Sequence, residues 1–251
     1  MRVTVCELSN DVDALEQDWQ ALVDHVRKRE SDFVVLPEMP FYPWIASTRQ
    51  VDASLWEEAV VAHEEWLARF PELATLGVMG TRPIVRDGRR LNEGFVWTSD
   101  GGYHPVHAKV YLPDEAGFWE ASWYDPGPSD FEVVEVNGVR LGFLICTEMW
   151  FHAHARSYAA QEIDLLCVPR ATPLSSVAKW IAGGRTTAVV SGAFCLSSNR
   201  WSSNNGIVWG GAGWIVEPEE GRLLGMTEMS SRAALLRSVS ERSAVIRIAG
   251  R

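Results

Sequence analysis

The stretch FVVLPEMPFYPW, residues 33–44, decides how the chain folds. Its opening apolar run is too hydrophobic for a strand with one face in water, so we expect a strand in the middle of a sheet, covered on both faces. The run ends on Glu38. A carboxylate costs several kcal/mol to take out of water unless it is paired or used, and sites in α/β proteins are built at strand ends. Glu38 is therefore the first candidate functional residue.

The segments around this strand alternate between strand and helix patterns. Residues 2–8 alternate as a strand does, and residues 12–29 carry apolar side chains at helical spacing. A second helix is predicted from Ser54, because Ser54 and Glu57 have the spacing of a capping box, and Pro71 is expected to end it. The chain thus begins with βαβ units.

The rest of the chain continues this alternation. Asn137 and Gly138 are predicted to form the turn of a hairpin, since this dipeptide favours a two-residue β-turn. The other predicted elements are strands at 75–86, 91–98, 164–170, 193–199 and 243–249, helices at 151–161 and 177–190, and a hairpin at 204–206. Early βαβ units followed by hairpins and further βα units predict an α/β sandwich, in one domain over residues 1–251.

The composition narrows the class of partner and the compartment. The chain has 251 residues, a net charge of −10 and a pI of about 5.1, which argue against binding to nucleic acid or an anionic membrane. Its apolar runs are all shorter than the roughly 18 residues of a membrane-spanning helix, and the N-terminus lacks a signal-peptide pattern. Four widely separated cysteines without a CxxC pair suit free thiols in a reducing cytosol. We therefore expect a cytoplasmic protein.

Two further residues lie in places like that of Glu38. Cys146 ends the apolar run LGFLIC and precedes a predicted helix, whose dipole would favour a thiolate. Lys109 lies in HAKVYLP, between apolar residues. Singly, each has an ordinary explanation: a buried cysteine packs as a small hydrophobe, and a lysine extends its ammonium to water. Together, the three supply a nucleophile, a carboxylate base and a fixed cation, a complete set for acyl transfer.

These segments resemble the nitrilase superfamily of carbon–nitrogen hydrolases, and the resemblance covers nearly the whole chain. VVLPE is similar to the strand that ends in the family's catalytic glutamate, here Glu38, and GFLICTEMWF to the segment of its nucleophile, here Cys146. HAKVYLPDEAGFWEASWYDPG is similar to the segment of the catalytic lysine, here Lys109, which also carries a second glutamate, here Glu120. Glu148 fills the acidic position that family members have after the cysteine.

The resemblance implies a fold, an assembly and a mechanism. The fold is a four-layer αββα sandwich, and the assembly is a homodimer or a larger homo-oligomer. Glu38 would take the proton of Cys146, whose sulfur would attack an amide carbonyl and form a thioester. Lys109 and the backbone N–H of Thr147 would hold the oxyanion, while Glu120 would orient Lys109. This chemistry requires no metal and no organic cofactor.

Other residues are expected to shape the substrate pocket. The family commonly continues RFPE past the acidic position, whereas this chain reads MWFHA at 149–153. Arg170, in VPRATP, is a candidate to bind a substrate carboxylate, with a surface or interface salt bridge as the alternative. His152 is a second candidate; it starts an HxH pair that lacks the further ligands of a zinc site, so no metal is expected there. The aromatic candidates, each of which also fits an ordinary core position, are Trp44, Trp119, Trp123 and Trp150.

Several functions remain open on sequence grounds. The length and the resemblance favour hydrolysis of a small amide, with hydrolysis of an N-carbamoyl amino acid or amine, or of a nitrile, as alternatives. A papain-like cysteine hydrolase using Cys146 with His152 or His154 is a rival without a local signature. The non-enzyme alternative is a catalytically silent α/β binding module, in which Cys146 belongs to the core. Thiol reactivity separates that interpretation from the hydrolases, because an activated cysteine is alkylated first.

Overall fold

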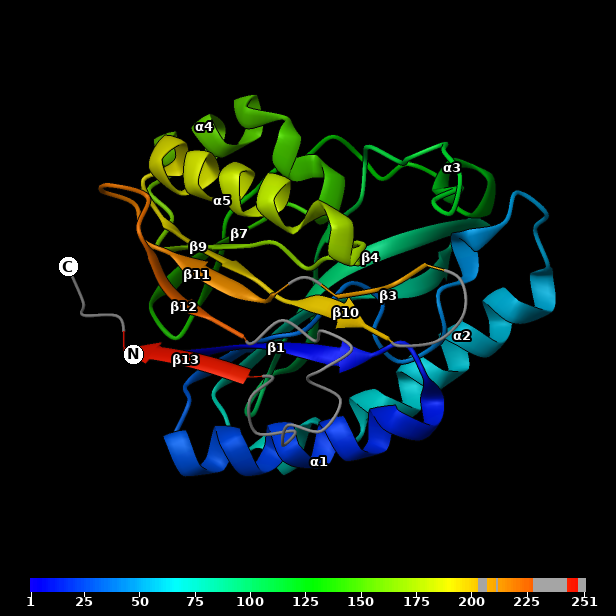
Figure 1. Ribbon diagram of the computed structural model, residues 1–251, viewed down its shortest axis with the longest axis horizontal. Coiled ribbons are helices and arrows are strands. Elements are labelled where there is room, and N and C mark those ends of the chain that lie inside the picture. The colour runs from blue at the N-terminus through cyan, green and yellow to red at the C-terminus, as the bar shows by residue number, and fades with distance from the viewer. Residues whose placement is uncertain (203–206, 211, 228–242, 248–251) are drawn as a thin grey trace.

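The computed structural model describes residues 1–202, 207–210, 212–227 and 243–247. The helices in these residues are α1 (Val12–Arg29), α2 (Ala53–Leu67), α3 (Glu120–Trp123), α4 (His152–Ala160) and α5 (Val177–Ser191). Two β-sheets lie face to face in the middle of the molecule, with α1 and α2 outside one sheet and α4 and α5 outside the other (Figure 1). This order of layers confirms the predicted four-layer αββα sandwich.

The first sheet is built around β2. Its strand order is β10-β1-β2-β3-β4-β5, and β13 also pairs with β1. The strands are β1 (Arg2–Ser9), β2 (Phe33–Val35), β3 (Gly77–Arg86), β4 (Arg89–Thr98), β5 (Gly102–Ala108), β10 (Asn199–Trp201) and β13 (Ser243–Arg247). β2 runs parallel to both of its neighbours, β1 and β3, and all its residues are buried. The central strand predicted from its apolar sequence is therefore confirmed.

The second sheet has the order β12-β11-β9-β8-β7-β6. Its strands are β6 (Val134–Val136), β7 (Val139–Phe143), β8 (Leu165–Cys167), β9 (Phe194–Ser197), β11 (Trp214–Val216) and β12 (Leu223–Met226). β7, β8 and β9 run parallel to one another. β6 and β7 form the predicted hairpin, in which Asn137 and Gly138 have the positive φ angles, 51° and 75°, that a tight two-residue turn requires.

One apolar cluster joins the two sheets. It brings Val5 and Val35 of the first sheet together with Phe143 and Leu165 of the second, and each of these side chains is at most 2% exposed. Because the sheets are held face to face, the segments that follow their parallel strands come together at one edge of the sandwich. Edges of this kind are where α/β proteins place their sites.

Helix α2 begins differently from the sequence-based prediction. Its N-cap is Asp52, whose side chain accepts a hydrogen bond from the Ser54 N–H at 2.9 Å, so the capping box predicted for Ser54 and Glu57 is wrong. Aspartate is as good a cap as serine, and it lies two residues earlier. The helix also ends at Leu67, ahead of Pro71, which lies inside a short 3-10 turn.

Two other segments complete the comparison with the predictions. Strand β5 is not among the predicted strands, because Pro105 and the neighbouring histidines break the alternation of polar and apolar residues that marks a strand. The hairpin predicted at 204–206 lies outside the described residues. The boundary of a single domain over 1–251 stays a prediction.

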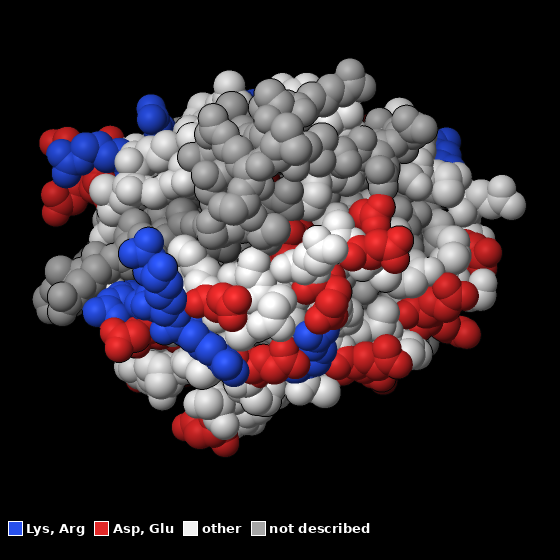
Figure 2. All heavy atoms as spheres, turned by 60° about the horizontal axis from the view of Figure 1, so that its bottom comes forward, with Lys and Arg blue, Asp and Glu red and all other residues white. Residues whose placement is uncertain are grey.

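The surface and the helices bear on the predicted partners. On the face that carries α1, acidic side chains are spread widely and basic ones gather toward one end (Figure 2). Within the residues that the structure describes, no helix has both the length and the apolar character needed to cross a membrane. The absence of nucleic-acid and membrane partners and the cytoplasmic location stay predictions.

Candidate active site

Two loops that follow parallel strands meet at the edge of the sandwich. Glu38 follows β2 and Cys146 follows β7. The Glu38 N–H donates to the Arg170 carbonyl at 3.1 Å, and the Cys146 N–H donates to the Pro169 carbonyl at 3.0 Å. The short backbone segment after β8 therefore positions the predicted base relative to the predicted nucleophile, although the two are far apart in the sequence.

Lys109, which follows β5, lies between two carboxylates. Its Nζ donates to Glu38 Oε1 at 2.8 Å and to Glu120 Oε2 at 2.6 Å. The Tyr124 hydroxyl also donates to Glu120 Oε2, and Asn92 Nδ2 donates to Glu38 Oε1 at 2.8 Å. All five side chains are buried. Since an ammonium has three N–H donors, Lys109 keeps one donor beyond those that the two carboxylates receive.

Burial and charge compete within this cluster. Burial disfavours the ammonium of Lys109, but the charges of Glu120 and Glu38 outweigh it and raise the lysine pKa, so Lys109 stays protonated. Burial raises the pKa of Glu120 to about 7, with Lys109 opposing the rise and Glu38 adding to it. Glu38 Oε2 has no hydrogen-bond partner among the described residues. It is the carboxylate oxygen that the cluster leaves unused; among the described residues of the cluster, Asn92 Oδ1 is also an unpaired acceptor.

Cys146 begins a 3-10 helix, η3 (Cys146–Trp150), with a left-handed backbone at φ 50°. This conformation is uncommon for residues other than glycine and is typical of nucleophiles held on sharp turns. Burial raises the pKa of the Cys146 thiol well above its usual range, the charge of Glu38 adds to the rise, and Lys109 offsets part of it. These surroundings favour the thiol, from which the predicted mechanism starts, over the thiolate that a helix dipole would favour.

A second buried glutamate holds the turn of Cys146 in place. Glu148 accepts from the Ile145 N–H at Oε2 and from the Val110 N–H at Oε1, each at 2.7 Å. His107 Nε2 donates to both oxygens, at 2.9 and 3.1 Å. Burial is the largest single influence on the pKa of His107 and lowers it, but the charge and hydrogen bond of Glu148, together with Asp130, outweigh burial and raise that pKa. Glu148 thus ties the turn of Cys146 to the segment that carries Lys109.

Two residues that sequence reasoning missed hold Glu38. Asn92 lies inside β4, in the polar stretch RRLNEG, where nothing in the sequence distinguishes it from its polar neighbours. Arg200, in β10, donates from Nε to the Glu38 carbonyl and from Nη1 to the Tyr42 carbonyl, both at 2.9 Å. No local pattern marks Arg200, because its partners belong to a loop that is remote in sequence.

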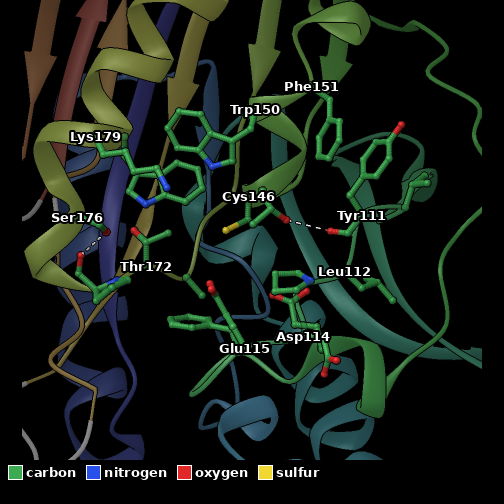
Figure 3. Close-up of a pocket in the computed structure, with 18 residues that line it drawn as sticks. Tyr111, Leu112, Asp114, Glu115, Cys146, Trp150, Phe151, Thr172, Ser176 and Lys179 are labelled. Carbon is green, nitrogen blue, oxygen red and sulfur yellow. Dashed lines mark hydrogen bonds between the residues drawn. The ribbon is translucent and has the colours of Figure 1, made fainter.

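A cavity of about 690 Å³ opens beside Cys146 (Figure 3). Cys146, Thr147 and Glu120 are part of its lining. Its aromatic lining consists of Tyr111, Phe118, Trp150, Phe151 and Trp180. The Thr147 hydroxyl donates to the Tyr111 carbonyl at 3.0 Å and so fixes the residue whose N–H is predicted to hold the oxyanion. A volume of this size suits a small molecule.

The four candidate tryptophans have different places around the site. Trp150 lines the cavity. Trp44 and Trp123 are buried, and their indole N–H groups donate to backbone carbonyls. Trp119 packs under the guanidinium of Arg49, 4.1 Å from its ring centre. These last three are not among the described residues that line the cavity, so their contact with a substrate stays a prediction.

Arg170 and His152 also lie outside the described lining of the cavity. The buried guanidinium of Arg170 donates to the hydroxyls of Ser197 and Thr172, at 2.6 and 2.9 Å, and to the Ala212 carbonyl at 2.8 Å. His152 is the first residue of α4. Contact with a substrate stays a prediction for both. The described residues contain no group of three or more histidine, cysteine or carboxylate side chains placed to hold a metal ion.

Comparisons with known proteins agree with this geometry. Residues 2–232 match the carbon-nitrogen hydrolase family. The chain is 24% identical to the citrullinase of Francisella tularensis over 68% of its own length and 61% of that protein. It is 30% identical to the N-carbamoylputrescine amidase of Arabidopsis thaliana over 42% of its own length and 36% of that protein. The matches thus span less than two thirds of either relative.

Solved structures share the fold over almost the whole chain. A carbon-nitrogen hydrolase from Helicobacter pylori superposes with a TM-score of 0.80 at 20% identity, over 98% of this chain and 88% of that one. An amidase from Nesterenkonia sp. superposes with a TM-score of 0.75 at 19% identity, over 98% of this chain and 89% of that one. The resemblance found in the sequence is confirmed: the chain belongs to the carbon-nitrogen hydrolase family.

Proposed function

We propose that this protein hydrolyses the carbon–nitrogen bond of a small amide, with Cys146 as nucleophile, Glu38 as general base and Lys109 as oxyanion stabiliser. The observation that carries the proposal is the unpaired Oε2 of Glu38, on a buried carboxylate that is hydrogen-bonded to the ammonium of Lys109 and whose charge acts on the buried thiol of Cys146. A carboxylate kept only for stability would have both oxygens satisfied. Within the described residues Glu38 Oε2 accepts no hydrogen bond, so it can accept a proton.

In the first half of the reaction Glu38 takes the proton of the Cys146 thiol while the sulfur attacks the amide carbonyl. A carbon–sulfur bond forms, and the carbonyl π electrons move to the oxygen. The remaining donor of Lys109 and the Thr147 N–H bind this oxyanion; losing one such donor typically costs about 2.7–4 kcal/mol of barrier. The tetrahedral intermediate then collapses, and Glu38 gives its proton to the departing ammonia, which leaves a thioester.

In the second half a water molecule hydrolyses the thioester. Glu38 takes a proton from the water, whose oxygen attacks the acyl carbon. The carbon–sulfur bond breaks, and the sulfur recovers its proton from Glu38. Glu120 keeps Lys109 in place through both halves by its 2.6 Å hydrogen bond. The net reaction adds one water across one carbon–nitrogen bond, so it consumes no cofactor.

A carbamoyl compound is the second candidate substrate, and the relatives favour it. Two of the curated relatives are named for citrulline and N-carbamoylputrescine, both of which end in a ureido group. A ureido carbonyl can be attacked by Cys146 in the same way. Hydrolysis of a nitrile is the remaining alternative. Assembly into a homodimer or larger homo-oligomer and a cytoplasmic location are part of the proposal as well.

The test is ammonia release from a panel of small primary amides, ureido compounds and nitriles, by the wild type and by Cys146→Ala. We expect turnover of at least one compound and its loss in the variant, with Cys195→Ala as the matched cysteine control that keeps it. Iodoacetamide labelling read by intact mass is the second measurement. Cys146 lines the cavity, whereas the other three thiols are at most 1% exposed, so it should react first. No turnover together with an inert Cys146 would favour the binding-module alternative.

A further inference from the structure

The charged side chains around the cavity are not all explained by the chemistry. Those in its lining are Asp114, Glu115, Glu120 and Lys179. Glu120 is bound to Lys109. Asp114 receives two hydrogen bonds from Arg49, at 3.1 and 3.3 Å, so its charge is neutralised by the protein itself. Two charges of opposite sign, those of Glu115 and Lys179, have no ion-pair partner within the described residues.

Lys179 lies where a cation is locally unfavourable. It belongs to the first turn of α5, a turn that contains no acidic residue, and the positive end of the helix dipole repels an ammonium. Its Nζ sits 4.9 Å from the ring centre of Trp150, the aromatic residue that closes the 3-10 helix of Cys146. The ammonium is thus held against the ring of Trp150 in the lining of the cavity, and no carboxylate of the described residues pairs with it.

Glu115 comes from the opposite wall. Its backbone is fixed by a pair of hydrogen bonds with Phe118, at 2.8 and 3.3 Å, which close a tight turn at the cavity. In Figure 3 Glu115 lies below Cys146, and Lys179 lies above it and to the left, and all three residues line the same cavity. Apolar and aromatic side chains, such as Leu112 and Trp150, make up much of the surface between them.

We propose that the substrate is the side-chain amide or ureide of an α-amino acid, whose carboxylate binds Lys179 and whose ammonium binds Glu115. This inference rests on the proposed function and names its substrate class. A zwitterionic head supplies one partner for each unpaired charge, and its methylene chain passes the apolar wall to bring the carbonyl to Cys146. Water added across the carbon–nitrogen bond gives an acid and ammonia from an amide, or an amine and carbamate from a ureide.

Two matched series of compounds test this assignment. One contains citrulline, N-carbamoylputrescine, which lacks the carboxylate, δ-ureidovalerate, which lacks the ammonium, and butylurea, which lacks both. The other contains glutamine, γ-aminobutyramide, glutaramate and butanamide, which differ in the same way. In one of the series the wild type should have its highest kcat/KM for the zwitterion. That value should exceed the kcat/KM of the compound without the carboxylate by about 10–100-fold, which is the range expected for one charge-assisted hydrogen bond.

Three variants test whether Lys179 and Glu115 are the residues that recognise the two charges of the substrate. Lys179→Met should abolish the advantage conferred by the carboxylate, and Glu115→Gln the advantage conferred by the ammonium. Lys179→Glu should reverse the order, so that the compound with only an ammonium is preferred to the compound with only a carboxylate. The charge-matched controls Lys28→Met on α1 and Glu57→Gln on α2 should keep the ratios of the wild type.

The outcomes separate this inference from the proposed function. Two results would refute the assignment of a zwitterionic head group and leave the proposed hydrolase intact. One is Cys146-dependent hydrolysis in which the uncharged compound is preferred. The other is that Lys179→Met and Glu115→Gln leave the kcat/KM ratios within each series unchanged. If no compound of either series is hydrolysed, the head-group assignment is also refuted. The proposed hydrolase activity is then tested by the alkylation of Cys146 and by turnover of the wider panel of amides, ureido compounds and nitriles. A preference that vanishes in the two neutral variants and reverses in Lys179→Glu supports the assignment.

Discussion

Glu38 and Glu148 are both fully buried glutamates that follow strands, yet their surroundings differ. Each oxygen of Glu148 accepts one backbone N–H and one contact from His107. Glu38 receives both of its hydrogen bonds, from Asn92 and Lys109, at Oε1, and Oε2 receives none from the described residues. A saturated carboxylate stabilises a turn, whereas an unsaturated one is free to take a proton. Burial alone does not distinguish a structural from a catalytic carboxylate.

The largest effect is expected from Glu38→Gln, which keeps the shape but removes the base. We expect kcat to fall by about 10²–10⁴-fold, the usual contribution of a general base. Stability should change little, because Glu38 and Glu120 share the single cation of Lys109 and the variant leaves a balanced pair. Steady-state kinetics measures the change in kcat, and thermal unfolding measures the change in stability. A large loss of stability with little loss of kcat would contradict the distinction between the two glutamates.

The same substitution at Glu148 should act mainly on stability. An amide nitrogen would face one of the backbone N–H donors of Ile145 and Val110, and the pair with His107 would be broken. Breaking a buried pair costs about 3–5 kcal/mol, which corresponds to roughly 10 °C in Tm for a chain of this size. The difference between Glu148→Gln and Glu38→Gln in calorimetry therefore tests the comparison directly. Equal values of Tm for the two variants would refute it.

The sequence predicts the three residues of the proposed chemistry for a physical reason. Glu38, Lys109 and Cys146 each come at the end of a strand or in the loop after it, which is a local pattern that can be read without knowing the fold. The resemblance to a known family then gave them roles. The predicted four-layer sandwich then implies that these three residues lie together at one edge, because it brings the ends of their strands together.

The supporting contacts cannot be read in this way. Asn92 and His107 act across strands, and Arg200 reaches the Glu38 loop from β10, so each depends on which side chains face each other after folding. The same limit explains Arg170: its loop was predicted to border the site, and its backbone carbonyl does hold Glu38, but its guanidinium donates to protein groups. A loop's position is easier to predict than the direction of its side chains.

Asn92→Ala should have an intermediate effect. It removes the 2.8 Å hydrogen bond to Glu38 Oε1 and leaves Lys109 as the one donor to that carboxylate within the described residues. The loss of a hydrogen bond to a charged group is worth about 1.5–3 kcal/mol, so kcat should fall by roughly 10–100-fold with KM little changed, since Asn92 is not part of the described cavity lining. The control is Asn137→Ala, in an exposed turn. A variant that raises KM and keeps kcat would show that Asn92 does not position the base.

The smallest effect concerns the protonation of His107. Its pKa is raised in the folded protein, where the charge and hydrogen bond of Glu148 together with Asp130 outweigh burial, so protonation of His107 stabilises the fold. That stabilisation is complete below the unfolded pKa of about 6.5 and is lost as the pH rises through the higher folded value. His107→Gln keeps a donor for Glu148 but cannot titrate. The wild type should exceed it in Tm by roughly 2–4 °C at about pH 6, for a contribution of about 1 kcal/mol, and less at about pH 9. A difference in Tm that stays constant with pH would mean that Glu148 holds the turn of Cys146 without needing a charged partner.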